Sequence, residues 1–267
     1  MTVADLKSFY INLDNAVERR AHMSAQISNI SFEIERFSAI LGSVVKEKIP
    51  GMSNGQLGCL LSHLTLLEDR QNNNFNLLIL EDDVVLSQDI DLLPSLPGYM
   101  SNNLPDWDVV YIDATIVQPS LMSYFFSLKK QLPPKQISVV KVERNMQAFG
   151  THGYLVNKNS TAKLAGLIRA YMSQGKAIDN IYVALTEAER INSYICLPYL
   201  CCGSIHTLNS QIEAGDVGDN IKIWHQIRRM YAKRNPISSE DERQFADLIQ
   251  QHLSLYGNTT FGHFLRI

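Results

Sequence analysis

Short apolar runs alternate with amphipathic stretches along the first part of the chain. Residues 9–13 are aromatic and β-branched and are followed by Asp14-Asn15, a pattern that predicts a strand ending in a turn. Residues 16–30 are mostly helix formers, and residues 32–37 alternate apolar and polar side chains as a half-buried strand does. The opening of the chain therefore predicts a β-α-β unit.

A capped helix is predicted next. Ser53-Asn54-Gly55-Gln56 has the S-x-x-Q form of a capping box. Leu57, Leu60, Leu61 and Leu64 then recur at i, i+3, i+4 and i+7, which indicates a helix with a leucine face. We expect this helix to run to about Gln71.

Two apolar runs predict buried strands that end in carboxylates. Residues 75–80 form a nearly unbroken apolar run, typical of a central strand covered on both faces, and Glu81-Asp82-Asp83 follow it. Residues 107–112 form a similar strand that stops at Asp113. Between residues 114 and 136 three prolines interrupt any period, so this stretch is predicted to be an irregular excursion over the sheet.

The remainder of the chain becomes increasingly helical. Its predicted elements are a strand at 153–156, a helix capped by Asn159 and running to about Ser173, a short helix after Asp179, a strand at 194–197, and closing helices at 219–234 and 239–255, the second opened by a Ser239-Glu240-Asp241-Glu242 capping box. Strands that alternate with helices predict an α/β layer architecture with ligands at the carboxyl ends of the strands.

Composition narrows the class of protein. The 267 residues carry a formal charge of −3, and 45% are apolar against 19% charged, which excludes a disordered or fibrous chain and a wholly basic nucleic-acid binder. We therefore expect no nucleic-acid partner. The N-terminus lacks a secretory signal pattern and no run approaches bilayer length, so we expect a cytoplasmic protein. Its four cysteines match neither a zinc framework nor a disulfide scaffold and are interpreted as reduced packing residues.

The acidic triplet Glu81-Asp82-Asp83 is the main candidate for chemistry. Three adjacent carboxylates repel one another, and a site that holds them together usually includes a cation, for which oxygen ligands favour Mg²⁺ or Mn²⁺. Such an ion would hold phosphates. The alternative is a solvated acidic turn.

Other polar residues cluster near the predicted turns. Cys59, Ser62 and His63 share one helix face; a nucleophilic role is disfavoured there, because a helix lacks oxyanion donors, and Ser62 and His63 are interpreted as hydrogen-bonding groups. Asn12 and the pair Arg19-Arg20 bracket the first strand-to-helix turn, where arginine can reach a diphosphate, although ordinary surface arginines are the simpler reading. No G-x-G-x-x-G or P-loop motif is present.

Four blocks, in order, resemble glycosyltransferase family 25, the bacterial lipooligosaccharide galactosyltransferases and their collagen-modifying relatives. They are Phe9 to Leu13 with Arg19-Arg20, Gly55 to His63, Leu78 to Asp83, and Gly150 to Leu155, and the resemblance spans about residues 8–212. It implies a GT-A type fold, with a single domain built on a central mixed, mostly parallel sheet over residues 1–215 and a helical extension over 216–267 packed on it. It further implies a UDP-sugar donor, usually UDP-galactose, a divalent metal, Mn²⁺ or Mg²⁺, and transfer with inversion.

The resemblance also suggests roles for individual residues. Asp83 would bind the metal and act in catalysis, and Glu81 would face the ribose or share the ion. Ile178-Asp179 is similar to a family segment where an inverting enzyme could place its base. Asp113 is a reserve candidate because it too ends a predicted strand. The remaining positions are Asn12, Arg20, Ser62 and His63 around the nucleotide, and His206 as a late member of the metal shell. Cys201-Cys202-Gly203 departs from the family pattern close to that histidine.

The predicted activity is β-galactosyl transfer from UDP-galactose to a saccharide acceptor of lipooligosaccharide. Inverting transfer needs one carboxylate to take the acceptor proton and a cation to neutralise the departing diphosphate. The alternatives are a UDP-glucose-dependent glucosyltransferase and a catalytically silent UDP-sugar or glycan-binding protein of the same fold.

One stretch suggests a membrane contact. Residues 221–235 carry five basic residues and no acidic one, with Ile223, Trp224, Ile227, Met230 and Tyr231 on an apolar side. Such a helix could lie peripherally on the anionic inner membrane surface. The alternative is a closing helix whose apolar stripe packs on the domain.

Overall fold

The structure is a computed structural model that describes residues 5–204 and 219–256. Within these residues seven strands form one central sheet in the order β2-β1-β3-β9-β5-β10-β7. Their bounds are β1 Leu6–Asn12, β2 Glu35–Ser38, β3 Asn76–Glu81, β5 Val109–Tyr111, β7 Ser138–Lys141, β9 Gly153–Val156 and β10 Ser193–Leu197. Strands β1, β2, β3, β5 and β10 run in one direction, whereas β9 and β7 run against their neighbours. The expected mixed, mostly parallel α/β architecture is confirmed.

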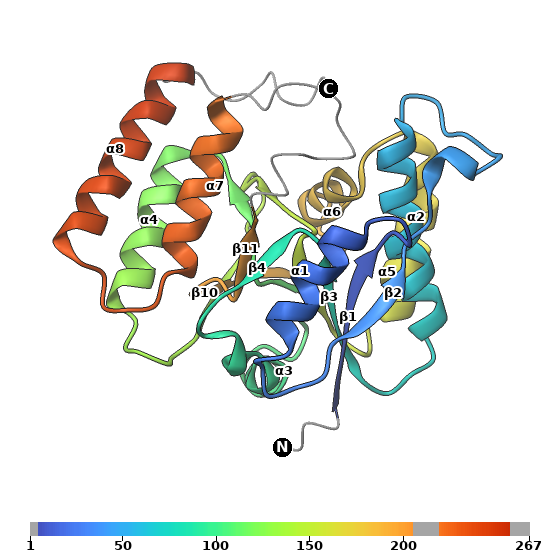
Figure 1. Ribbon diagram of the computed structural model, residues 1–267, viewed down its shortest axis with the longest axis horizontal. Helices are drawn as coiled ribbons and strands as arrows, with labels where there is room; N and C mark the ends of the chain where they lie inside the picture. Colours follow the sequence, from blue (N-terminus) through green and yellow to red (C-terminus); the bar gives the residue numbers. More distant parts are fainter. Residues whose placement is uncertain (1–4, 205–218, 257–267) are drawn as a thin grey trace.

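Helices cover both faces of this sheet. They are α1 Val17–Ile27, α2 Asn54–Arg70, α3 Leu96–Asn103, α4 Pro119–Gln131, α5 Thr161–Tyr171, α6 Ile178–Glu187, α7 Asp219–Ala232 and α8 Ser239–Tyr256. In Figure 1, α4, α7 and α8 gather on one side of the molecule and α2, α5 and α6 on the other. All six pack against the same face of the sheet, and α1 and α3 cover the opposite face. Short 3₁₀ turns at Gly42–Val44, Ile90–Ser95 and Met172–Gln174 complete the connections.

Strand alternation separates the core into two layers. Phe9 and Ile11 of β1 pack in the cluster that contains the apolar faces of α2, α4, α5, α6, α7 and α8, whereas Tyr10 packs in a second cluster with α1 and α3. This division follows from the period of two along a strand, which sends successive side chains to opposite faces. The sheet is therefore covered on both faces, as the apolar run 75–80 predicts.

Two small antiparallel ladders lie outside the central sheet. β4 (Val84–Leu86) pairs with β11 (Cys201–Gly203), and β6 (Thr115–Ile116) pairs with β8 (Ala148–Phe149). The β4–β11 ladder begins directly after the acidic triplet, and the backbone N–H of Ser204 donates to the carbonyl of Asp83 at 2.7 Å. These strands fix the exit of the chain from the predicted site.

The α2 capping box is confirmed. The Ser53 hydroxyl accepts from the Gln56 backbone N–H, the Gln56 side chain accepts from the Ser53 backbone N–H, and the helix ends at Arg70 with Gln71 as its C-cap. The cysteines of the described residues are free, with Cys59 partly exposed and the others buried, in agreement with reduced packing residues.

Three sequence expectations are wrong in detail. Most of the segment 114–136, predicted to be irregular, is the helix α4, which starts at Pro119, a residue that a first helical turn accepts without losing a hydrogen bond. The helix predicted to be capped by Asn159 has Ser160 as its N-cap. The capping box of α8 is displaced by one residue, because Ser238 and Asp241 exchange the two side-chain to backbone hydrogen bonds.

The apolar side of α7 faces the protein core. Ile223, Ile227, Met230 and Tyr231 are buried there, and Arg228 is 4% exposed. The apolar stripe that the membrane hypothesis requires is thus already used for packing, and the structure favours the closing-helix alternative. No helix among residues 5–204 and 219–256 is long and apolar enough to cross a bilayer. The cytoplasmic location and the boundary near residue 215 stay predictions.

Candidate active site

A cleft of about 220 Å³ opens at the carboxyl ends of β1 and β3. One wall consists of Ile11, Leu13 and the acidic triplet; the opposite wall consists of residues 39–43 and the first turns of α2, which contribute Cys59, Ser62 and His63. In an open α/β sheet the strand ends form the usual ligand crevice, since the loops diverge there. The cleft therefore lies where the alternation of strands and helices predicts a ligand.

Close backbone contact shapes the α2 wall. Gly42 and Gly58 face each other, and a methyl group at Gly58 would lie 2.6 Å from the carbonyl oxygen of Ile40. The Ser62 hydroxyl accepts from the Ile40 backbone N–H at 2.8 Å and donates to the Gly58 carbonyl at 2.6 Å. Ser62 thus holds the wall in place while lining the cleft.

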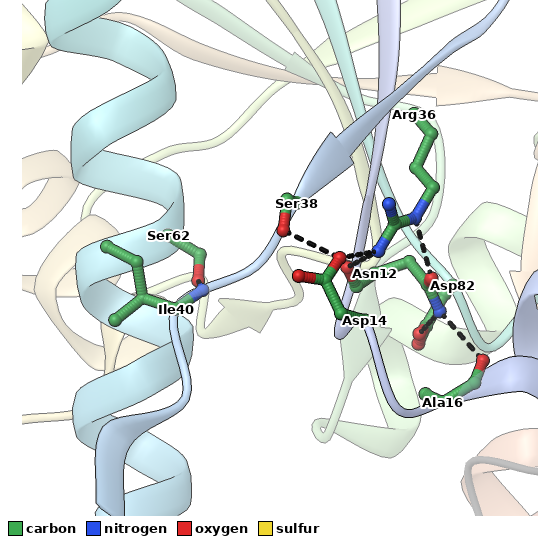
Figure 2. Close-up of polar contacts among 8 residues, drawn as sticks. All are labelled: Asn12, Asp14, Ala16, Arg36, Ser38, Ile40, Ser62 and Asp82. Carbon is green, nitrogen blue, oxygen red and sulfur yellow. Dashed lines mark hydrogen bonds and ion pairs between the residues drawn. The ribbon is translucent and has the colours of Figure 1, made fainter. Parts of the chain in front are cut away.

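The turn between β1 and α1 is fixed by a side-chain network, which Figure 2 shows. The Asn12 amide donates to Asp82 Oδ2 at 2.6 Å and to the Ala16 carbonyl at 3.2 Å, and its oxygen accepts from Arg36 Nε at 2.9 Å. Arg36 also binds the carboxylate of Asp14. Asn12 is 1% exposed and is not among the residues that line the cleft, so its observed contacts are with the protein itself.

Arg19, rather than Arg20, reaches the cleft. Arg19 Nη1 lies 3.1 Å from Asp82 Oδ1, and both residues line the cleft, whereas Arg20 does not. Burial raises the pKa of Asp82 to about 6, against the lowering effect of Arg19 and Asn12. Asp82, the middle carboxylate of the triplet, is therefore paired with the Arg19 guanidinium.

The outer carboxylates of the triplet meet a histidine. One potential ligand atom each of Glu81, Asp83 and His152 lies within 4.8 Å of the other two. The Thr151 hydroxyl donates to Glu81 Oε1 at 2.8 Å, while His152 Nδ1 is buried and has no hydrogen-bond partner among the residues that the structure describes. Two carboxylates and an imidazole nitrogen form a donor set that suits Mn²⁺. These residues fit a divalent cation.

His63 lies next to Glu81 of this cluster and is fully buried. Its Nδ1 is hydrogen-bonded to the hydroxyl of Tyr154 at 2.8 Å, and the two rings stack with centroids 5.7 Å apart. Its Nε2 lies 3.6 Å from Glu81 Oε1. Burial raises the pKa of Glu81, but contact with His63 and the charge of His152 outweigh this and hold the pKa below its usual range. Glu81 is therefore an anion at neutral pH.

Asp179 stands in the first turn of α6, close to the same cluster. It does not line the cleft, but the charges of Glu81 and His152 both act on it. Burial raises the pKa of Asp179; the Asn180 backbone N–H, which donates to it at 2.7 Å, opposes this change, and Glu81 adds to it. A carboxylate with a raised pKa next to a cation site has the character of a proton acceptor.

Asp113, the reserve candidate for the base, has a structural role instead. It is fully buried and forms a bidentate ion pair with Arg228 of α7, with Arg228 Nε donating to Asp113 Oδ1 at 2.7 Å. A base with both oxygens engaged by a buried guanidinium has no room for a substrate hydroxyl. His206 lies outside the described residues, so its role in a metal shell stays a prediction.

Sequence reasoning missed the position of His152. The residue stands just before β9, which runs antiparallel to β3 and pairs Gly153 with Leu80. The beginning of β9 therefore meets the carboxyl end of β3, where the triplet lies. The block Gly150 to Leu155 contained the histidine, but strand direction, which the pattern does not reveal, was needed to place it.

A mostly parallel α/β sheet with clustered carboxylates beside a cleft at its strand ends is typical of an α/β protein that binds a nucleotide. Residues 5–182 match the model of glycosyltransferase family 25, described as an LPS biosynthesis protein. The chain belongs to glycosyltransferase family 25. It is thus a glycosyltransferase of a lipopolysaccharide biosynthesis family.

Two proteins of similar sequence agree with this assignment. The chain is 22% identical to the lipooligosaccharide biosynthesis protein lex-1 of Haemophilus influenzae, over 77% of this chain and 79% of that protein. It is 25% identical to a putative glycosyltransferase of the same organism, over 61% and 57% of the two chains. The crystal structure of mouse xyloside xylosyltransferase 1 in its apo form covers 72% of this chain and 65% of its own, with a TM-score of 0.34 and 11% identity.

Proposed function

We propose that this protein transfers galactose from UDP-galactose, with inversion, to a saccharide acceptor of lipooligosaccharide. The observation that carries the proposal is the convergence of Glu81, Asp83 and His152 within 4.8 Å at the edge of the cleft. In a sugar-nucleotide transferase the leaving group is a nucleoside diphosphate, and a cation held at such a place neutralises it. The names of the relatives support the choice of acceptor class.

In this proposal each residue's role follows from its place in or beside the cleft. The donor nucleotide occupies the cleft with its diphosphate near Arg19 and the acidic triplet and its apolar parts against Ile11 and Leu13. Glu81, Asp83 and His152 hold Mn²⁺ or Mg²⁺, which supplies Lewis-acid stabilisation of the departing UDP when it is bound. His63 lies against Glu81 and helps to keep its carboxylate ionised.

Asp179 acts as the base in this proposal. Inversion requires a group that takes the proton of the acceptor hydroxyl as that oxygen attacks the anomeric carbon from the face opposite the leaving diphosphate. Asp179 lies outside the donor cleft yet close to Glu81 and His152, which suits the acceptor side of the reaction.

Release of UDP tests the proposal. The protein is incubated with UDP-galactose and truncated lipooligosaccharide acceptors after treatment with EDTA, and Mn²⁺ is then restored. We expect turnover to disappear with EDTA and to return with Mn²⁺. The same assay with UDP-glucose tests the donor sugar. Retained UDP binding without turnover on any acceptor would contradict an enzymatic role and favour a binding protein.

A further inference from the structure

A second set of potential metal ligands shares Glu81 with the cation site. Cys59, His63 and Glu81 each place one ligand atom within 4.8 Å of the other two. Cys59 and His63 occupy one face of α2, one turn apart, and Glu81 ends the neighbouring strand β3. All three residues line the cleft.

His63 presents a nitrogen suited to a metal. Its Nε2 is fully buried, forms no hydrogen bond shorter than 3.5 Å with any described residue, and lies 3.6 Å from Glu81 Oε1. Two ligands on one tetrahedral zinc ion stand roughly 3.3–3.6 Å apart, given bond lengths of about 2.0–2.2 Å. Its other nitrogen is held by the Tyr154 hydroxyl at 2.8 Å, and such a partner fixes the ring orientation and tautomer of a ligating histidine.

The donor atoms differ in kind between the two sets. Glu81, Asp83 and His152 are mainly oxygen donors and favour Mn²⁺ or Mg²⁺, whereas thiolate, imidazole and one carboxylate favour Zn²⁺ and leave a fourth position open. Burial and the carboxylates Glu81 and Asp179 raise the pKa of the Cys59 thiol well above its usual value. A bound dication reverses that local electrostatic balance and releases the thiol proton to water.

We infer that Cys59, His63 and Glu81 form a zinc site that inhibits the enzyme. Zinc there takes Glu81 from the catalytic cation, because the two donor sets share this one carboxylate. Binding of zinc follows from the described side chains alone, whereas inhibition rests on the proposed function. The two parts are therefore tested by separate measurements.

Binding is tested by titrating the full-length protein with Co²⁺, which substitutes for Zn²⁺ and shows a thiolate-to-cobalt charge-transfer absorption. We expect the absorption in the wild type and its loss in Cys59→Ser and Cys59→Ala. Cys202→Ser is the matched control and keeps it, because Cys202 belongs to neither donor set. His63→Gln weakens Co²⁺ affinity by about tenfold or more. Absence of the absorption in the wild type, or its persistence without Cys59, would overturn the site.

Inhibition is tested with Zn²⁺ added to the Mn²⁺-supported reaction, each variant being compared with its own rate without zinc. We expect Mn²⁺ to relieve inhibition competitively and Cys59→Ser to raise the inhibitory zinc concentration by about tenfold or more. Zinc inhibition that is equal in Cys59→Ser and wild type would refute the regulatory role. If neither the wild type nor any variant transfers sugar, the proposed function fails. The cobalt spectra then still show whether Cys59, His63 and Glu81 bind a metal ion.

Discussion

The buried ion pair between Arg228 and Asp113 fastens α7 to the end of β5, and its disruption should be costly. The two side chains are 4% and 0% exposed and form two parallel hydrogen bonds. Arg228→Met leaves the Asp113 carboxylate buried without its partner, which costs about 3–5 kcal/mol. A domain is stable by only about 5–15 kcal/mol, so this loss is about a fifth of the total or more.

Urea unfolding followed by circular dichroism measures the effect. Arg229→Met is the matched control, because Arg229 is the exposed neighbour on the same helix; we expect a change within about 0.5 kcal/mol. Adding Asp113→Asn to Arg228→Met removes the buried charge and should recover part of the loss, which a double-mutant cycle reports as coupling. A loss below about 1 kcal/mol in Arg228→Met, or equality with the control, would refute this reasoning.

Two further predictions concern the walls of the cleft and the last helix. Gly58→Ala should lower stability and weaken UDP binding, because its methyl group would lie 2.6 Å from the Ile40 carbonyl oxygen. Gly166→Ala is the control: nothing lies within 4 Å of its added methyl group, so this substitution should stabilise α5 by about 0.5–1 kcal/mol. Thermal unfolding measures the stability of both variants, and UDP titration measures their nucleotide binding. Asp241→Asn should destabilise the protein near neutral pH, because hydrogen bonds from Lys233 and Ser238 lower the pKa of Asp241 from 3.8 to about 2. Because the pKa of Asp241 is lower in the folded state than in the unfolded state, its contribution to stability is lost as the pH falls from about 4 to 2. The unfolding free energies of wild type and Asp241→Asn should therefore converge over that range. A difference that stays constant would contradict this prediction.

Local patterns predicted much of the fold. The leucine spacing and capping box of α2 and the apolar run of β3 each appear in the structure because they are properties of neighbouring residues. The helix α4 was missed since its prolines suggested irregular chain, yet Pro119 stands at the start of the helix, where it is tolerated. Strand order and direction depend on contacts far apart in the sequence and could not be read from a local pattern.

The candidate site shows the same limit. The triplet at the end of β3 was recognisable because adjacent carboxylates after a buried apolar run are unusual. The different contacts of its three carboxylates could not be predicted from the sequence. Only the fold shows that Arg19 engages Asp82 and that His152 meets Glu81 and Asp83. The adjacent Arg19 and Arg20 project about 100° apart around α1, so the choice between them required the position of that helix on the sheet.

The central claim is that Asp83 belongs to the cation and nucleotide site while Asp179 acts on the acceptor. Calorimetric titration of UDP in the presence of Mn²⁺, paired with turnover assays on wild type, Asp83→Asn and Asp179→Asn, tests it most directly. We expect Asp83→Asn to weaken Mn²⁺-dependent UDP binding by about tenfold or more. We expect Asp179→Asn to bind UDP as the wild type does and to lose about 10²–10⁴-fold in transfer rate. Equal loss of UDP binding in both variants would contradict this division of roles.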